Sequence, residues 1–205
     1  MVKMTDTPAR KPYAVDAASL PNGFPTHRHD PRFWEALGRV VATFGFLEET
    51  LGKAIFAITA TTEYSDEAVA AAVTKWGGTL EAALTDALGA KITGYERAVK
   101  AAAGVEFGSI TWLIEDLREA SKVRNALCHG PWGLPDEAGA SMPFFVDRNL
   151  ARFDTKVDVA FLEQVQRHVT ELAMAVVNSV TVTGWQFPGS NGPGEPIWQP
   201  GTSQS

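Results

Sequence analysis

The sequence lacks the features that would place the protein outside the cell or in a membrane. Its single cysteine, Cys128, excludes an intrachain disulfide and is compatible with a reducing compartment. Charged residues interrupt the richest apolar segments, so that no run approaches the length needed to cross a bilayer. The basic residues between Met1 and Pro12 are not followed by the apolar stretch of a secretory signal. These absences predict a soluble, cytoplasmic protein.

The chain also has fewer basic than acidic residues. The 18 lysines and arginines are outnumbered by 24 aspartates and glutamates, which gives a formal net charge of −6. Nonspecific nucleic-acid binding relies on basic side chains that release counterions, so this balance argues against a broad binding surface of that kind. Any nucleic-acid role needs a local positive site. Glycine-rich phosphate loops of the Walker or Gly-x-Gly-x-x-Gly type are absent too, which leaves nucleotide hydrolysis of those classes unsupported.

Ligands for a metal are few. His27 and His29 lie close together in a proline-rich segment, but a structural zinc needs further ligands that Cys128 alone cannot supply. We therefore predict no metal and no other cofactor. Adjacent helical residues diverge by about 100°. His129 is therefore poorly placed to activate Cys128, which we expect to be a small buried hydrophobe.

Hydrophobic residues make up 45% of the chain, enough for a sizeable core. Their spacing of three and four residues predicts amphipathic helices, with Gly77-Gly78 ending the second and Asp158 opening the last. The expected helices cover residues 32–58, 65–76, 79–99, 110–128 and 158–180. This pattern predicts an all-α fold, a bundle of four to five helices.

The helical domain, residues 32–183, is flanked by two irregular segments. Prolines break any periodicity in an N-terminal arm, residues 1–31, and the Pro/Gly-rich tail, residues 184–205, is predicted to be disordered. Residues 132–156 form an insertion without helical period. Within it, Met142 to Val146 and the segment around Phe153 are candidates for a short hairpin.

Two charged residues fall on apolar helix faces. Arg124 lies near the middle of the arc formed by Leu117, Leu127 and their apolar neighbours, and Glu48 lies inside the apolar arc of the first helix. An isolated buried ion costs several kcal/mol or more, so each charge needs a partner or a polar pocket. An ion pair between Arg124 and Glu48 meets this need. It is compatible with a purely structural role and with a role in aiming the guanidinium.

Two further polar residues gather beside Arg124. Asn125 and His129 are four apart, so on a continuous helix they share a face, next to the break at Gly130-Pro131. Taken alone, His129 is typical of a C-terminal helix cap. The C-terminal end of a helix is electronegative, so the positive charge for a bound anion must come from Arg124.

The segment Arg124-Asn125-Ala126-Leu127-Cys128-His129-Gly130 resembles the signature of HEPN (higher eukaryotes and prokaryotes nucleotide-binding) domains. That signature is an arginine, often followed by a polar residue, and then a histidine after four to six intervening residues; here four intervene. Phe44-Gly45-Phe46-Leu47-Glu48 also resembles sequences upstream of the motif in bacterial members. The resemblance implies a metal-independent ribonuclease, a toxin or defence nuclease that acts as a homodimer and is in some cases held by an antitoxin protein.

The implied chemistry suits these residues. The 2′-hydroxyl of RNA is the nucleophile, His129 transfers protons near neutral pH, and Arg124 holds the phosphate. Asn125 orients His129 or the phosphate, and Glu48 lies behind Arg124. The products are a 2′,3′-cyclic phosphate and a 5′-hydroxyl, and DNA is not cut. A homodimer with the motif at its interface supplies a second histidine. The alternative is a non-catalytic helical module for dimerisation or protein binding.

Overall fold

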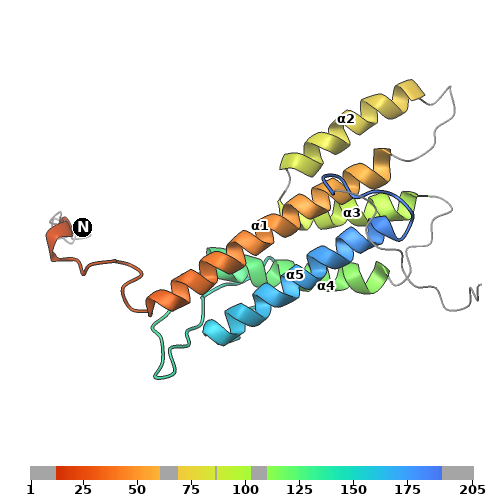
Figure 1. The fold of residues 1–205 in the computed structure, drawn as a ribbon. Coiled ribbons are helices and arrows are strands. Elements are labelled where there is room, and N and C mark those ends of the chain that lie inside the picture. The colour runs from red at the N-terminus through yellow and green to blue at the C-terminus, as the bar shows by residue number, and fades with distance from the viewer. Residues whose placement is uncertain (1–12, 61–68, 86, 103–109, 191–205) are drawn as a thin grey trace, which may run out of the picture.

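The computed structural model describes residues 13–60, 69–85, 87–102 and 110–190. These segments contain five α-helices and isolated β-bridges, which confirms the predicted all-α bundle. Helix α1 is central, because it contacts each of the other four, and α5 lies alongside it (Figure 1). The helices are α1 (Pro31–Ala60), α2 (Val69–Thr85), α3 (Leu88–Ala101), α4 (Ile110–His129) and α5 (Val159–Thr181).

The core lies where α1 meets its neighbours. Val40, Leu47 and Leu51 of α1 are fully buried at the three- and four-residue spacing seen in the sequence. Tyr95 of α3 is buried as well, and its hydroxyl forms a hydrogen bond with Ser179 of α5. Burial raises the pKa of Tyr95 to about 12, so the phenol stays neutral and joins two helices within the core.

The predicted boundary between the second and third helices is wrong. Gly77 and Gly78 lie inside α2, which continues to Thr85. A glycine costs a helix about 1 kcal/mol relative to alanine, but packing against a neighbouring helix offsets such a cost. α2 has that packing, because a Cβ on Gly52 of α1 would lie only 2.8 Å from the carbonyl oxygen of Ala83. Residues 65–68, the expected start of this helix, lie outside the described residues.

The segment between α4 and α5 contains the predicted hairpin in minimal form. Phe153 N donates to Phe145 O at 3.0 Å, and an antiparallel bridge joins Val146 to Arg152. A second bridge, between Ser141 and Val157, ties the insertion back to the start of α5. The insertion is therefore fixed to the bundle at both of its ends.

The described part of the N-terminal arm is fastened to this insertion. His29 is buried, stacks on Phe33, and forms a 2.9 Å hydrogen bond through Nε2 with Ser141 Oγ. Burial lowers the pKa of His29, which favours the neutral imidazole. Trp34 and Trp132 pack edge to face beside it. These tryptophans, which are dispersed in the sequence, therefore meet in one aromatic cluster.

Residues 184–190, assigned to the tail on composition, lie against the helices. Phe187 is only 8% exposed, because its ring reaches the apolar core. Residues 191–205 lie outside the described part of the chain. Among the described residues, none of the helices combines the length and the apolar character that a membrane span requires.

Candidate functional site

Four predicted site residues meet around one guanidinium group, near the C-terminal end of α4. Arg124 Nη1 donates to Asn125 Oδ1 at 3.3 Å and lies 3.5 Å from His129 Nε2. Arg124 Nη2 donates to Glu48 Oε1 of α1 at 3.5 Å. The structure thus contains the ion pair expected from the two apolar helix faces. We call Glu48, Arg124, Asn125 and His129 the Arg124 cluster.

The cluster is partly shielded and open to solvent at one end. The side chains of Arg124 and Glu48 are 26% and 24% exposed, and His129 is exposed. All three contacts of the guanidinium are long for hydrogen bonds, so its N–H groups remain available to an incoming anion. A guanidinium only donates, so a hydrogen bond to His129 requires a neutral imidazole with Nε2 as the acceptor.

Gly130 lets the insertion pack closely against the end of α4. Its N–H closes the last turn by donating to Ala126 O at 3.0 Å. A Cβ at position 130 would lie 2.8 Å from that same oxygen and 2.8 Å from Pro143 Cβ. Only glycine fits between these atoms without displacing them, so Gly130 fixes where the chain leaves His129.

Replacing Gly130 with alanine is expected to lower the free energy of unfolding by about 1–3 kcal/mol, as overpacking does elsewhere. Urea unfolding followed by circular dichroism measures this loss. Gly77→Ala is the matched control, because a Cβ at Gly77 has no atom within 4 Å. That control should leave stability unchanged or raise it. A Gly130→Ala protein as stable as the control would contradict the close packing.

A groove opens beside the Arg124 cluster, between α1, α2 and α3. It has a volume of about 480 Å³, and Glu48 belongs to both features. Lys91 lines it while being only 7% exposed. Lys91 was not predicted from the sequence. The signal was present, because Lys91 shares the buried face of Leu88, Ile92 and Tyr95 in the way Arg124 shares that of α4. We call this the Lys91 groove; its remaining lining residues are Gly45, Glu49, Gly52, Lys53, Phe56, Ala83 and Leu84.

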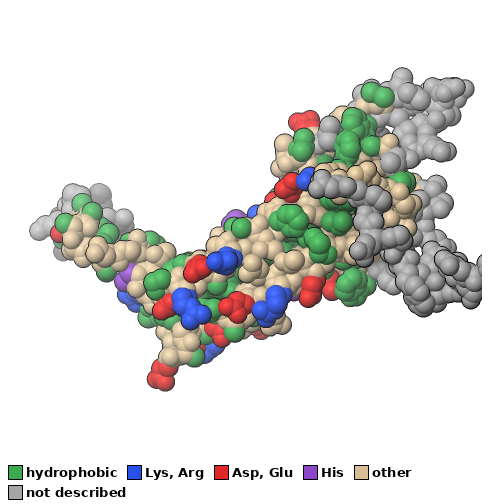
Figure 2. All heavy atoms as spheres, in the orientation of Figure 1, with side chains coloured by type: hydrophobic (Ala, Val, Ile, Leu, Met, Phe, Trp, Pro, Cys, Tyr) green, Lys and Arg blue, Asp and Glu red, His purple; other side chains and the backbone are tan. Residues whose placement is uncertain are grey.

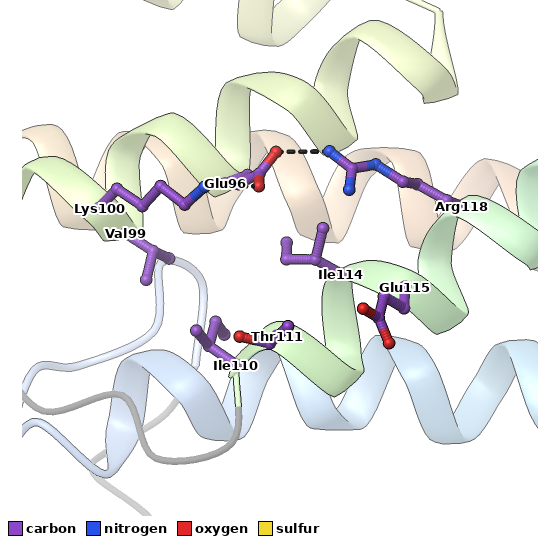
Figure 3. Close-up of a pocket in the computed structure, with 8 residues that line it drawn as sticks. All are labelled: Glu96, Val99, Lys100, Ile110, Thr111, Ile114, Glu115 and Arg118. Atoms are coloured by element: carbon purple, nitrogen blue, oxygen red, sulfur yellow. Dashed lines mark hydrogen bonds and ion pairs between the residues drawn. The ribbon is translucent and has the colours of Figure 1, made fainter.

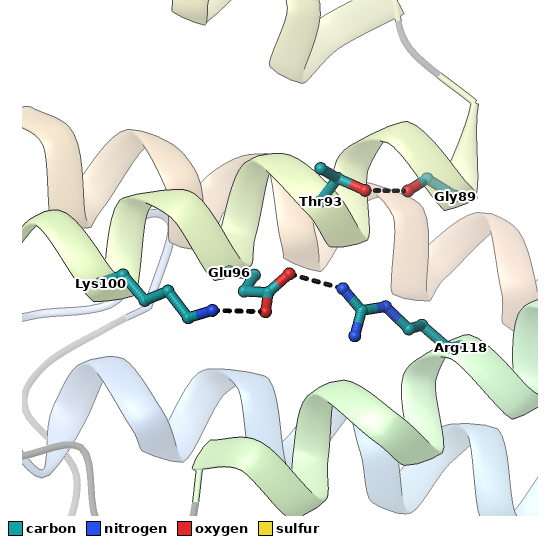
Figure 4. A network of polar contacts seen from close by, with 5 residues as sticks. All are labelled: Gly89, Thr93, Glu96, Lys100 and Arg118. Carbon is teal, nitrogen blue, oxygen red and sulfur yellow. Dashed lines mark hydrogen bonds and ion pairs between the residues drawn. The ribbon is translucent and has the colours of Figure 1, made fainter.

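A second hollow, of about 100 Å³, lies between α3 and α4 (Figure 3). Glu96 points into the space between the two helices, where it pairs with Lys100 at 2.8 Å and with Arg118 at 2.5 Å (Figure 4). The hydrogen bond from Lys100, supported by the charge of Arg118, lowers the pKa of Glu96. Glu115 also lines the hollow, so that its two acidic side chains balance its two basic ones, and we assign no site to it.

The expectation that Cys128 is a buried hydrophobe is wrong. Its side chain is exposed, while Ala126 and Leu127 are the buried residues of the last turn. The buried face of α4 passes through Leu117, Ala120 and Leu127, and Cys128 lies outside it. Over the described ranges, histidine, cysteine and acidic residues form no group of three that could hold a metal ion.

No protein-family model matches the chain, and neither a curated protein nor a solved structure matches it. The resemblance to HEPN domains therefore remains a prediction based on a short motif.

Acidic and basic side chains are interspersed over the face shown in Figure 2.

Proposed function

We propose that this protein is a metal-independent endoribonuclease that cleaves RNA by attack of a 2′-hydroxyl on the adjacent phosphate. The observation that carries the proposal is the 3.5 Å contact between Arg124 Nη1 and His129 Nε2 at an exposed helix end. It brings a proton-transfer group and a phosphate-binding group within reach of one phosphodiester.

The reaction follows from these two groups. Neutral His129 takes the proton of the 2′-hydroxyl, O2′ forms a bond to phosphorus, and the bond from phosphorus to O5′ breaks. Arg124 stabilises the negative charge that builds on the phosphoryl oxygens. Asn125, which accepts from Arg124 at 3.3 Å, and Glu48, at 3.5 Å, hold the guanidinium in place. The products are a 2′,3′-cyclic phosphate and a 5′-hydroxyl.

The leaving O5′ needs a proton, and a single cluster offers only one histidine. A second copy of the chain related by a two-fold axis supplies a second His129 as the acid. We therefore propose a homodimer with the two Arg124 clusters facing each other. A toxin or defence role, with an antitoxin partner, goes with this proposal.

The test is incubation of the purified protein with an RNA and a DNA of the same sequence in EDTA. We expect cleavage of the RNA only, because DNA lacks the nucleophilic hydroxyl. RNA that stays intact at every protein concentration would remove the proposal, and cleavage of both strands would point to another chemistry.

The Arg124–Glu48 ion pair favours one alternative. A carboxylate 3.5 Å from the guanidinium neutralises its charge, as expected of a non-catalytic helical module that dimerises or binds a protein. In that case Arg124→Ala should sharply lower the melting temperature of a protein that never cuts RNA.

A further inference from the structure

In the part of the chain that the structure describes, Lys91 is a basic side chain of its groove that forms no ion pair. Glu48 pairs with Arg124 at 3.5 Å and Glu49 with Lys53 at 2.7 Å. Within the described ranges, no carboxylate forms an ion pair with Lys91, whose Nζ donates only to the backbone oxygen of Glu48, at 3.5 Å. A buried ammonium without an opposite charge is costly, so the groove is suited to an anion that completes it.

Lys91 lies in the first turn of α3, and a helix N-terminus has a partial positive charge of its own. The N-cap of α3 is Ala87, which makes no side-chain hydrogen bond to the first turn. The N–H groups of an uncapped helix N-terminus favour phosphate. Leu84, at the end of α2, also lines the groove. The lysine and the helix end therefore attract the same kind of ligand.

Part of the groove wall is apolar, beside the charged side chains of Glu48, Glu49 and Lys53. Phe56 and Leu84 line it and are 37% and 71% exposed. The ring of Phe56 packs on Trp76, with 5.6 Å between the centroids, which restricts its motion. A ligand that combines an anionic group for Lys91 with a flat apolar part for Phe56 and Leu84 matches this arrangement. A nucleotide has both, in its phosphate and its base.

Glu48 belongs to both the groove and the Arg124 cluster. The backbone oxygen of Glu48 contacts Lys91, and its carboxylate contacts Arg124. We propose that the Lys91 groove is a substrate subsite: Lys91 binds the phosphate of a nucleotide flanking the one cleaved at Arg124, with its base against Phe56 and Leu84. This inference rests on the proposed function in taking RNA as the ligand.

Binding to an uncleavable strand tests the subsite directly. The probe is a fluorescein-labelled, fully 2′-O-methylated RNA of about ten nucleotides, titrated in EDTA at several NaCl concentrations and followed by anisotropy. Lys91→Met should weaken binding roughly five- to tenfold at low salt and make the slope of log K against log salt shallower by about 0.7. Lys91→Arg should keep the slope of the wild type.

The matched control is Lys100→Met. It removes the same charge from the same helix, but Lys100 is exposed and pairs with Glu96 away from the groove (Figure 4). We expect wild-type binding from this variant. If Lys91→Met unfolds, Ala87→Asp serves instead, because an N-cap aspartate stabilises α3 and repels phosphate. It should also weaken binding of the probe.

Three results would overturn the subsite: an unchanged affinity and slope in the groove variants, equal losses in Lys91→Met and Lys100→Met, or no binding of the probe by the wild type. The probe has no free 2′-hydroxyl, so its binding does not depend on cleavage. Cleavage of natural RNA without an effect of Lys91 would refute the subsite alone. An effect of Lys91 on binding without cleavage would refute the nuclease alone.

Discussion

Replacing His129 with alanine is expected to lower the rate of RNA cleavage by about 10²–10⁴-fold, the usual contribution of a positioned acid–base group. The melting temperature should hardly change. His129 is exposed, and its contact with Arg124 is a long one of 3.5 Å, so little packing is lost. Initial rates on a fluorogenic RNA in EDTA, together with thermal unfolding, measure both quantities.

His168→Ala is the matched control for this variant. His168 is an exposed histidine on α5 and takes no part in the Arg124 cluster. The control should cleave RNA at the wild-type rate. If His129→Ala retained full activity, or lost stability without losing activity, His129 would be a helix cap with no catalytic role.

Replacing Arg124 with alanine is expected to reduce cleavage by about 10²–10³-fold, as removal of one transition-state hydrogen-bond donor does elsewhere. Arg124→Lys should recover part of this loss, because it keeps the charge but not the planar fork that holds two phosphate oxygens. The stability loss should be about 1 kcal/mol, because water screens a pair whose side chains are about a quarter exposed.

Glu48→Gln separates the structural role of Arg124 from its proposed catalytic role. It removes the charge of the partner while keeping a side chain of nearly the same shape. A double-mutant cycle of Glu48→Gln with Arg124→Ala, measured by urea unfolding, gives the coupling energy of the pair. If the coupling is large and the folded Arg124→Ala protein cleaves RNA normally, Arg124 belongs to the scaffold.

The sequence was most informative where a charged residue lies on an otherwise apolar helix face. Arg124 and Glu48 each interrupt an apolar helix face, and the structure brings them into contact at 3.5 Å. Lys91 shows the same disagreement within the expected helix 79–99, where it shares a face with Leu88, Ile92 and Tyr95. The boundary expected at Gly77-Gly78 is wrong, because α2 continues to Thr85. That error arose because packing of α2 on α1, which local propensity does not contain, sustains the helix through two glycines.

Long-range packing accounts for the other differences. Trp34 and Trp132 lie far apart in the chain and meet in one cluster with His29, which forms a hydrogen bond with Ser141 in the insertion. Phe187 reaches the core from a segment whose glycine and proline content predicts disorder. In each case the deciding contact lies between segments whose proximity no local pattern encodes.

The mass of the 3′ ends left on an RNA oligonucleotide, after incubation in EDTA with the wild type or with His129→Ala, tests the central claim most directly. The proposed chemistry predicts 2′,3′-cyclic phosphate ends from the wild type and almost none from the variant. Ends bearing a 3′-hydroxyl, or the same cyclic ends in equal amount from both proteins, would contradict it.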